Sequence, residues 1–424
     1  MFLVPSVFGR PYLYSDSAAV SVSSRIVAAL TVHLQENILY QALSEAVRRF
    51  PQLAVSPAVS GSEYCFQPAS GNLAIFRADD PDQPECFGDS RLGGYLFKVS
   101  YLHKTLFFDF HKSIADEYGM MTFAKSVLYR YLELSGFPLE NDGTVKLMSS
   151  TYFSAEGDDP MEKLAEIPAS RPVWYMDAEA LRLTQHSAES ERVVTVRIPI
   201  SKLRSGLEQV SRTPVTYLAP VFSEAVSELE DPSRDQGKYV VASIMVNLRP
   251  YFPAASLRPF CTPVYLAYNR RLTEYPYNTV LMSQKKLLEA QLKSDALAYS
   301  AERTASLIEK AVDGAGTLEQ KKNMVLEMHQ QMAAHSTYSI CRVGNIILPD
   351  SMQRLVTDFY PVIPSGNQAY ALSVVTYRGE IIVSVSGKSD TWAVTRRFVE
   401  LLNSNMIDAY LSDEYIFSPM NYHP

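Results

Sequence analysis

Cysteine, basic charge and long apolar runs are scarce in this sequence of 424 residues. Its four cysteines are widely separated and form no CxxC pair, which argues against structural zinc and a disulfide framework and fits a reducing cytoplasm. Lys and Arg number 39 against 46 Asp and Glu, a net charge of −7, so a nucleic-acid-binding surface is not expected. No apolar run approaches the roughly 20 residues of a membrane-spanning helix, and the first residues lack the regions of a signal peptide. We therefore expect a cytoplasmic protein with no membrane span and no nucleic-acid partner.

The histidines also lack the spacing of metal ligands, so no metal is expected. What is present is an ordinary globular composition, with 47% hydrophobic and 20% charged residues. A chain of this length exceeds one simple core, and two domains are expected. Residues from about 141 to 192 show little helix or strand pattern, which places a boundary there. The predicted organisation is an N-terminal half over residues 1–165, a linker over 166–192 and a C-terminal half over 193–424.

Periodicity in the N-terminal half predicts two helices and a hairpin. Apolar residues recur at helical spacing over residues 34–53. Alternating aromatic and β-branched residues over 95–110 then predict a β-hairpin with its turn near His103-Lys104. A second helix follows over residues 118–136 and ends at a glycine.

The C-terminal half mixes strand and helix patterns in the same way. Its predicted elements are a strand from Arg192, a helix capped by Ser201, a helix capped by Thr213, a buried strand over 239–247, helices over 283–312 and 318–334, a hairpin turning at Arg378-Gly379, and a last helix capped by Ser389 or Asp390. Each half therefore combines helices with a mostly antiparallel sheet, and the default position for an active site is between the halves.

The segment LFFDFHKSIADEYGMMTF, residues 106–123, places polar residues at the end of a buried strand. Side chains alternate along a strand, so His111 shares a face with Asp109 while Lys112 takes the opposite face. Both could enter one cavity only if a β-bulge bent the chain between them. Histidine has an ordinary pKa of about 6.5 and serves as a base near neutral pH, whereas the pKa of lysine must fall by about three units. As a cation, Lys112 could instead bind a phosphate or polarise a carbonyl, and Asp116 suits the N-cap of the next helix.

Four segments of this chain, taken in order, resemble one family. They are RRFPQL at the end of the first helix, HKSIADEYG after the hairpin, VNLRPYFPAASLRPF over residues 246–260, and GNIILP over residues 344–349. The ordered set covers nearly the whole chain and resembles the chloramphenicol-acetyltransferase-like superfamily, which includes condensation domains of nonribosomal peptide synthetases. Within it, the segments are most similar to bacterial alcohol acetyltransferase-like proteins.

The resemblance implies an α+β fold of two related halves that form a V with a tunnel between them. An acyl thioester, either acyl-CoA or the phosphopantetheine arm of a carrier protein, would enter from one side. A small-molecule alcohol or amine would enter from the other side and receive the acyl group, for which acetyl is the first expectation.

The family signature, His-x-x-x-Asp-Gly, falls on the segment after the hairpin with a shift of one residue. Asp116 takes the aspartate position and Glu117 that of the first glycine, while Lys112 stands four residues before the aspartate, where the family has its histidine. The resemblance implies His111 as the catalytic base, provided the backbone bends, and Asp116 as an orienting residue that pairs with an arginine. Residues predicted to contact substrate are Lys112, Tyr118 and Arg249.

Two hypotheses follow from this imperfect match. The first is an acyltransferase that uses His111. The second is a catalytically degenerate relative that keeps the fold as a binding or scaffold module. The second is motivated by Lys112, by Glu117, and by CRVG at residues 341–344 in place of the family's Ser/Thr-Asn-x-Gly turn.

Overall fold

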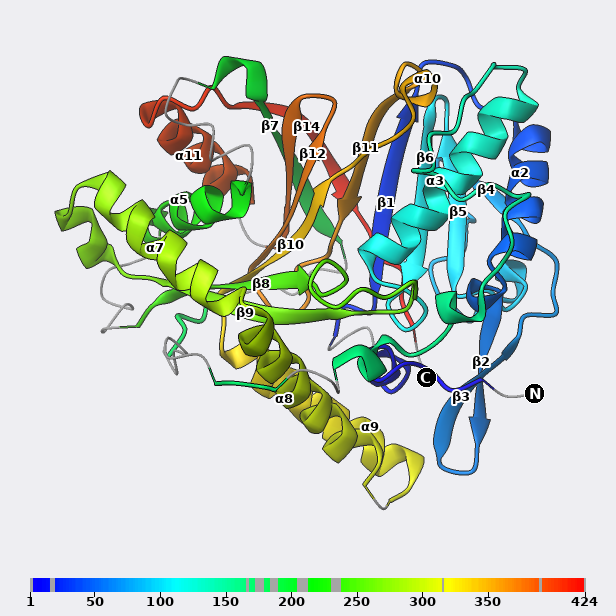
Figure 1. Ribbon diagram of the computed structural model, residues 1–424, viewed down its shortest axis with the longest axis horizontal. Coiled ribbons are helices and arrows are strands. Elements are labelled where there is room, and N and C mark those ends of the chain that lie inside the picture. The colour runs from blue at the N-terminus through cyan, green and yellow to red at the C-terminus, as the bar shows by residue number, and fades with distance from the viewer. Residues whose placement is uncertain are drawn as a thin grey trace.

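Figure 1 shows the computed structural model of the chain, which describes residues 3–15, 20–164, 168–171, 179–183, 190–203, 213–229, 238–314, 316–388 and 391–422. Two large sheets with their helices form the two halves, and a small hairpin of β2 (Val55–Ser60) and β3 (Glu63–Pro68) extends from the N-terminal half. The predicted layered α+β architecture with two halves is confirmed.

The N-terminal half contains a five-stranded sheet in the order β11, β1, β6, β5, β4. The bounds of these strands are Val356–Val362, Ser23–Leu30, Thr105–His111, Phe97–Leu102 and Ile75–Arg77. β5 and β6 form the predicted hairpin, and His103 at its turn has a positive φ of 52°. Neighbouring strands are antiparallel except for β4 and β5.

Helices α2 (Glu36–Arg49) and α3 (Glu117–Leu134) pack on one face of this sheet. Phe108 of β6 meets Phe123 of α3 edge to face, with ring centroids 6.4 Å apart. Strand alternation therefore turns the side chains of Asp109 and His111 to the other face, toward the C-terminal half.

The C-terminal half contains a seven-stranded sheet in the order β14, β7, β13, β12, β10, β8, β9. The bounds are Tyr410–Phe417, Glu191–Pro199, Glu380–Gly387, Tyr370–Tyr377, Tyr338–Asn345, Val240–Asn247 and Cys261–Tyr268. β10 runs parallel to β12 and β8, and the other neighbours are antiparallel. The hairpin predicted at Arg378-Gly379 is β12–β13, with positive φ at both turn residues.

The longer helices of this half are α5 (Pro214–Leu229), α7 (Tyr277–Gln291), α8 (Ser294–Val312), α9 (Leu318–Ala334) and α11 (Thr391–Ser404). The helical region predicted over 283–312 consists of two helices, α7 and α8, and it begins earlier than predicted, at Tyr277. Lys293 between them has extended backbone angles, φ −67° and ψ 145°, and this break lets both helices contact β9. Residues 204–212, which include most of the helix predicted after Ser201, and the predicted caps Ser389 and Asp390 lie outside the described residues.

One strand crosses from the second half of the sequence into the N-terminal sheet. β11 lies in the second half of the sequence, yet it pairs along β1 in the N-terminal sheet, with Arg25 opposite Val362. β7 already begins at Glu191, two residues before the predicted start of the C-terminal half. The described N-terminal sheet therefore includes one strand from the second half of the sequence. The division into residues 1–165, 166–192 and 193–424 stays a prediction.

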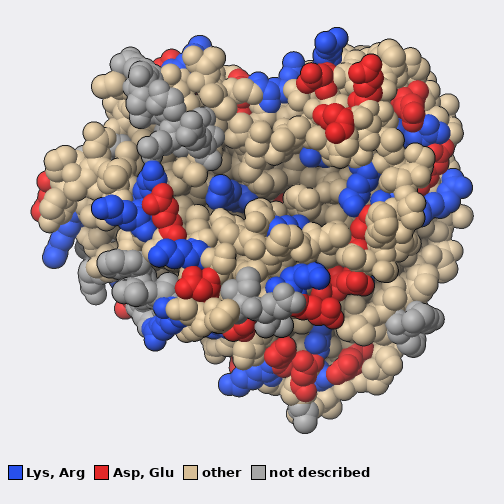
Figure 2. All heavy atoms as spheres, in the orientation of Figure 1, with Lys and Arg blue, Asp and Glu red and all other residues tan. Residues whose placement is uncertain are grey.

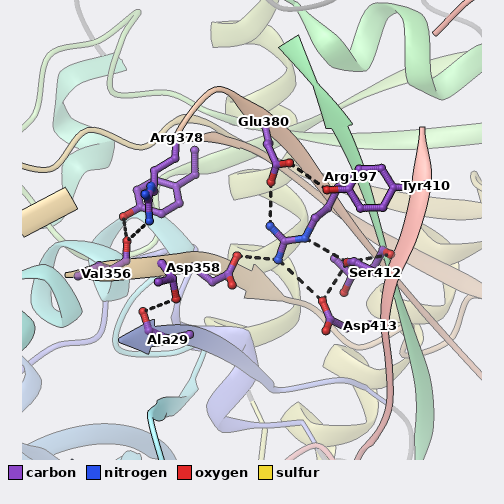
Figure 3. A network of polar contacts seen from close by, with 12 residues as sticks. Ala29, Arg197, Val356, Asp358, Arg378, Glu380, Tyr410, Ser412 and Asp413 are labelled. Carbon is purple, nitrogen blue, oxygen red and sulfur yellow. Dashed lines mark hydrogen bonds and ion pairs between the residues drawn. The ribbon is translucent and has the colours of Figure 1, made fainter. Parts of the chain in front are cut away.

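A polar network around Arg197 holds the crossing strand to the C-terminal sheet (Figure 3). Arg197 of β7 donates from Nη2 to Asp358 of β11 at 2.6 Å and from Nη1 to Glu380 of β13 at 3.0 Å. Its Nε donates to Ser412 Oγ of β14 at 3.1 Å. The guanidinium of Arg197 thus links four strands, β7, β11, β13 and β14. Because the Arg197 side chain is largely buried, solvent screens its attraction to Asp358 and Glu380 only weakly.

Candidate active site

The predicted corner lies where β6 ends. Pairing of β6 with β1 and β5 is regular up to its last residues, with Ser23 opposite His111 and Phe97 opposite Phe110, and no bulge interrupts these described ladders. The backbone turns directly after His111, and the N–H of Lys112 donates to the carbonyl of Val22. The bend that would have turned His111 toward the opposite side is therefore absent from these pairs.

His111 is fully buried within protein side chains. Its ring meets Tyr422 and Phe87 edge to face, at centroid distances of 4.7 and 5.4 Å. Nδ1 accepts the Ser113 N–H at 3.2 Å and lies 2.6 Å from Ser113 Oγ. The proton of the neutral ring then belongs to Nε2, which has no hydrogen-bond partner among the described residues. Burial, with the charge of Lys112, lowers the pKa of His111 to about 3, so the ring is neutral.

Figure 2 shows that the face of the molecule is hollowed between the two halves, with Lys and Arg side chains in the hollow. Two cavities have walls from both halves. The larger, about 530 Å³, includes Arg25, Lys98 and Phe107 from the sheet face that His111 shares, but His111 does not line it. Arg25 and Lys98 are engaged there with Asp109, at 2.7 and 3.8 Å.

The second cavity, about 260 Å³, lies at the corner itself. Its wall includes Phe8, Tyr12, Lys112, Asp116 and Glu117 from the N-terminal half and Met245, Cys261, Met328, His329, Cys341 and Ile363 from the second half of the sequence. We call it the corner pocket. It contains Lys112, whereas His111 is not among its wall residues.

Lys112 is the cation of the corner pocket. Burial lowers the pKa of its ammonium, and the nearby Glu117 opposes that change. Nζ lies 5.9 Å from the ring centroid of Tyr12, and no hydrogen bond or ion pair of this ammonium is found within the described ranges. An ammonium at the wall of a cavity, without a fixed partner among the described residues, can act on a bound carbonyl oxygen or another anionic group.

Asp116 connects α3 to the C-terminal half. Its Oδ1 accepts the Gly119 N–H at 2.9 Å and so caps α3. Its Oδ2 accepts from Arg249 Nη1 at 2.7 Å and from the Phe260 N–H at 2.9 Å. Both Asp116 and Arg249 are buried, so the aspartate–arginine pair implied by the family resemblance is present as a fixed frame below the pocket.

The helix start also needs Gly119. A Cβ at this position would stand 2.0 Å from the carbonyl oxygen of Leu257, a backbone atom that cannot move aside. Glu117 is accommodated at the position where the family has its first glycine, and its Oε1 accepts from Ser24 Oγ at 2.8 Å.

Two residues predicted to contact substrate lie outside the corner pocket. Arg249 is taken up by Asp116 and by the carbonyls of Ser256 and Arg258. The exposed ring of Tyr118 covers this guanidinium, with 4.6 Å between the Arg249 Cζ and the ring centroid. Their predicted substrate contact remains a prediction, and so does the base role of His111, which the packing separates from the pocket.

Sequence reasoning missed several wall residues, among them Tyr12, His329 and the thiols of Cys261 and Cys341. Burial raises the pKa of both thiols well above the usual value, so both stay protonated and neither is a ready nucleophile. Tyr12 and His329 could not be identified from a single sequence. Tyr12 lies in the short helix α1 (Arg10–Leu13) and His329 in α9, and only the fold brings these two helices to the corner pocket. In the described part of the chain, no group of three or more His, Cys, Asp or Glu side chains is placed to hold a metal. Likewise, none of its helices is long and apolar enough to cross a membrane.

No family model and no curated protein matches the sequence, but solved structures match the fold. TRI101 of F. graminearum, complexed with coenzyme A and T-2 mycotoxin, aligns over 97% of this chain and 99% of its own, with a TM-score of 0.61 and 10% identity. Polyketide synthase associated protein 5 from Mycobacterium tuberculosis aligns over 96% of this chain and 99% of its own, at 0.58 and 12%.

A mutant of the starter condensation domain of rhizomide synthetase RzmA, in complex with C8-CoA and Leu-SNAC, aligns over 96% of this chain and 94% of its own, with a TM-score of 0.57 and 13% identity. At these identities the likeness establishes the fold. The chain has the fold of these three structures, and this is the fold class that its motif order predicted.

Proposed function

We propose that the chain transfers an acyl group from a coenzyme A thioester to the hydroxyl or amine of a small molecule bound in the corner pocket. One observation carries the proposal: the ammonium of Lys112, which has no hydrogen bond or ion pair among the described residues, lines a cavity between the two halves, beside the Asp116–Arg249 frame. In the same fold, TRI101 and the RzmA domain are complexed with coenzyme A and C8-CoA. An acetyl group and an alcohol are the first candidates for the two substrates.

The corner pocket suits the acyl end of such a donor. Met245, Ile308, Met332 and Ile363 give it apolar walls that can contact an acyl chain and the thioester arm. Lys112 gives it one positive charge. A single ammonium fits one developing oxyanion, whereas the phosphates of coenzyme A would need cations outside this pocket.

The reaction needs one addition and one elimination. The acceptor oxygen or nitrogen attacks the thioester carbonyl carbon, and the carbonyl oxygen becomes an oxyanion that the Lys112 ammonium stabilises. The C–S bond then breaks, the carbonyl re-forms, and the thiolate receives the proton that the acceptor lost. Removing one oxyanion-stabilising group costs about 10²- to 10³-fold in rate.

The test is release of free thiol from acetyl-CoA and octanoyl-CoA in the presence of a panel of alcohols and amines, with product detection by mass spectrometry. Lys112→Met should lower kcat/KM by about 10²- to 10³-fold. Lys104→Met, in the exposed turn of the β5–β6 hairpin, is the matched control and should keep the wild-type rate. Absence of thiol release from every donor, including a phosphopantetheinylated carrier protein, would overturn the proposal.

A second candidate is a binding module without turnover. It is favoured by the position of His111, whose ring is enclosed by Phe87 and Tyr422 instead of facing the pocket. This candidate predicts heat of acetyl-CoA binding in calorimetry, weakened by Lys112→Met, with no thiol released from any donor. Turnover with any acceptor would exclude it.

A further inference from the structure

The helical pair α8–α9 forms one side of the corner pocket, far in sequence from the corner. α9 begins with a capping box, in which Thr317 and Gln320 satisfy each other's backbone groups. One face of α9 contributes Met328, His329 and Met332 to the pocket wall. Met332 is four residues from Met328 and three from His329, so the three side chains lie on one side of the helix and line the same cavity.

One ring nitrogen of His329, Nε2, is buried in this wall without a hydrogen-bond partner among the described residues. The ring lies against Tyr12, with 5.8 Å between the ring centroids, and Tyr12 also faces the ammonium of Lys112. A buried nitrogen without a partner is costly, and this one lines a cavity in which a bound molecule could supply the partner.

The other titratable groups of the pocket are poorly suited to take up a proton. Burial raises the pKa of Tyr12, Cys261 and Cys341, so these groups hold their own protons at neutral pH. The carboxylate of Asp116 is occupied by Arg249 and the Phe260 N–H, and that of Glu117 accepts from Ser24.

His329 differs from all of these. Burial and the charge of Lys112 lower its pKa to about 4, so its imidazole is neutral at pH 7 and has a lone pair to offer.

The positive charge of Lys112 influences the protonation of His329. While the ammonium is uncompensated, it disfavours a second positive charge on His329. When an oxyanion forms against Lys112, the ammonium is neutralised in part, and the proton affinity of His329 rises at the step that requires it.

We propose that His329 is the general base of the corner pocket, accepting the proton of the acceptor hydroxyl or amine while Lys112 stabilises the oxyanion. The inference rests on the proposed acyl transfer and assigns the proton to a residue outside the motif. The acceptor's O–H or N–H bond breaks as its bond to the carbonyl carbon forms, which makes an imidazolium. The C–S bond then breaks, the thiolate takes the proton from the imidazolium, and the neutral ring is restored.

The test compares His329→Gln, His329→Ala and the control His335→Ala, which alters the residue that follows α9 and leaves the pocket wall unchanged. His329→Gln should lower kcat/KM by at least 100-fold while thermal unfolding and acetyl-CoA affinity stay near wild type. Added imidazole should restore at least tenfold activity to His329→Ala and none to His329→Gln. His335→Ala should stay within twofold of wild type.

Three results would overturn the inference. If wild type transfers acyl groups and His329→Gln stays within threefold of it, the base lies elsewhere and the proposed function stands. If both variants lose activity together with acetyl-CoA binding and imidazole restores none, His329 is a structural residue. If wild type itself releases no thiol, the proposed function fails and the base assignment fails with it.

Discussion

The corner after β6 and the middle of α9 each bring a histidine close to Lys112, and the two histidines have different surroundings. The ring of His111 is enclosed by Phe87, Tyr422 and Ser113, and it lines neither cavity. The ring of His329 lines the corner pocket and touches Tyr12. In both, Nε2 has no hydrogen-bond partner in the described structure, but only His329 is placed where a ligand can provide one.

The histidine in the segment that resembles the family signature, His111, is therefore not the histidine that is placed to accept a proton from a bound molecule, His329. Regular strand pairing up to the end of β6 fixes the direction of His111, which does not line the corner pocket, and the turn directly after His111 places Lys112 at its wall. The corner supplies the cation and the rigid frame. The helical pair supplies a neutral imidazole. Four variants measure how far this division holds.

The largest effect is expected from Asp116→Ala, which tests the corner as a frame. It removes the partner of a buried guanidinium, the acceptor of the Phe260 N–H and the cap of α3, so we expect a loss of about 3–5 kcal/mol of folding free energy in urea unfolding. Asp79→Ala, which breaks the exposed Arg77–Asp79 pair, should leave the midpoint nearly unchanged. Equal small losses from the two variants would show that the corner does not depend on this ion pair.

Gly119→Ala is expected to destabilise next most strongly. Alanine normally favours a helix over glycine, but here its Cβ would meet the Leu257 carbonyl oxygen at 2.0 Å, so we expect a loss of about 1–3 kcal/mol. Gly88→Ala, where a Cβ would meet no atom within 4 Å, serves as the control for thermal unfolding. A stabilised Gly119→Ala variant would mean that the start of α3 can move away from residue 257.

His111→Phe tests the enclosed histidine through pH. The unfolded chain binds a proton on this ring below about pH 6.5, whereas the folded protein binds it only near its pKa of about 3. Folding stability contributed by the neutral ring is therefore present above pH 6.5 and falls as the pH decreases, by about 1.4 kcal/mol per pH unit. Phenylalanine does not titrate, so urea unfolding of the variant between pH 6.5 and 4.5 should lose less stability than wild type by that slope. Parallel slopes would place His111 in contact with solvent.

The smallest effect on stability is expected from His329→Gln. Its Nε2 has no hydrogen bond to a described residue that the change would break, so the folding free energy should stay within about 1 kcal/mol of wild type at pH 7.5. Chemical denaturation provides the measurement. A loss of folding free energy as large as that of Asp116→Ala would show that His329 stabilises the fold as Asp116 does. The proposed difference between the two regions would then be wrong.

Much of the architecture could be read from the sequence because it depends on local patterns. The 3.6-residue period over 34–53 became α2, and Thr213-Pro214 marks the start of α5. The aspartate–arginine pairing was anticipated through the family resemblance, and strand alternation foresaw that His111 and Lys112 diverge. The two functional hypotheses and the acyl donor stay predictions.

What could not be read depends on contacts between distant segments. Strand alternation predicts that the side chains of His111 and Lys112 point in opposite directions. Only the packing of Tyr422 and Phe87 on His111 shows which of the two is enclosed by protein. His329 lies in an amphipathic helix whose pattern gives no reason to choose one polar residue over another. The break at Lys293 likewise arises from the packing of α7 and α8 on β9, and a helical period continues through it.

The crossing of β11 into the N-terminal sheet has a consequence for synthesis of the chain. β1 is synthesised long before its partner along one edge, β11, because more than 300 residues separate the two strands in the sequence. Until then the nascent N-terminal sheet has an unpaired, largely apolar edge, a template for pairing with other chains. Closing so long a loop is slow. We therefore expect the N-terminal sheet to be completed only after β11 has been synthesised.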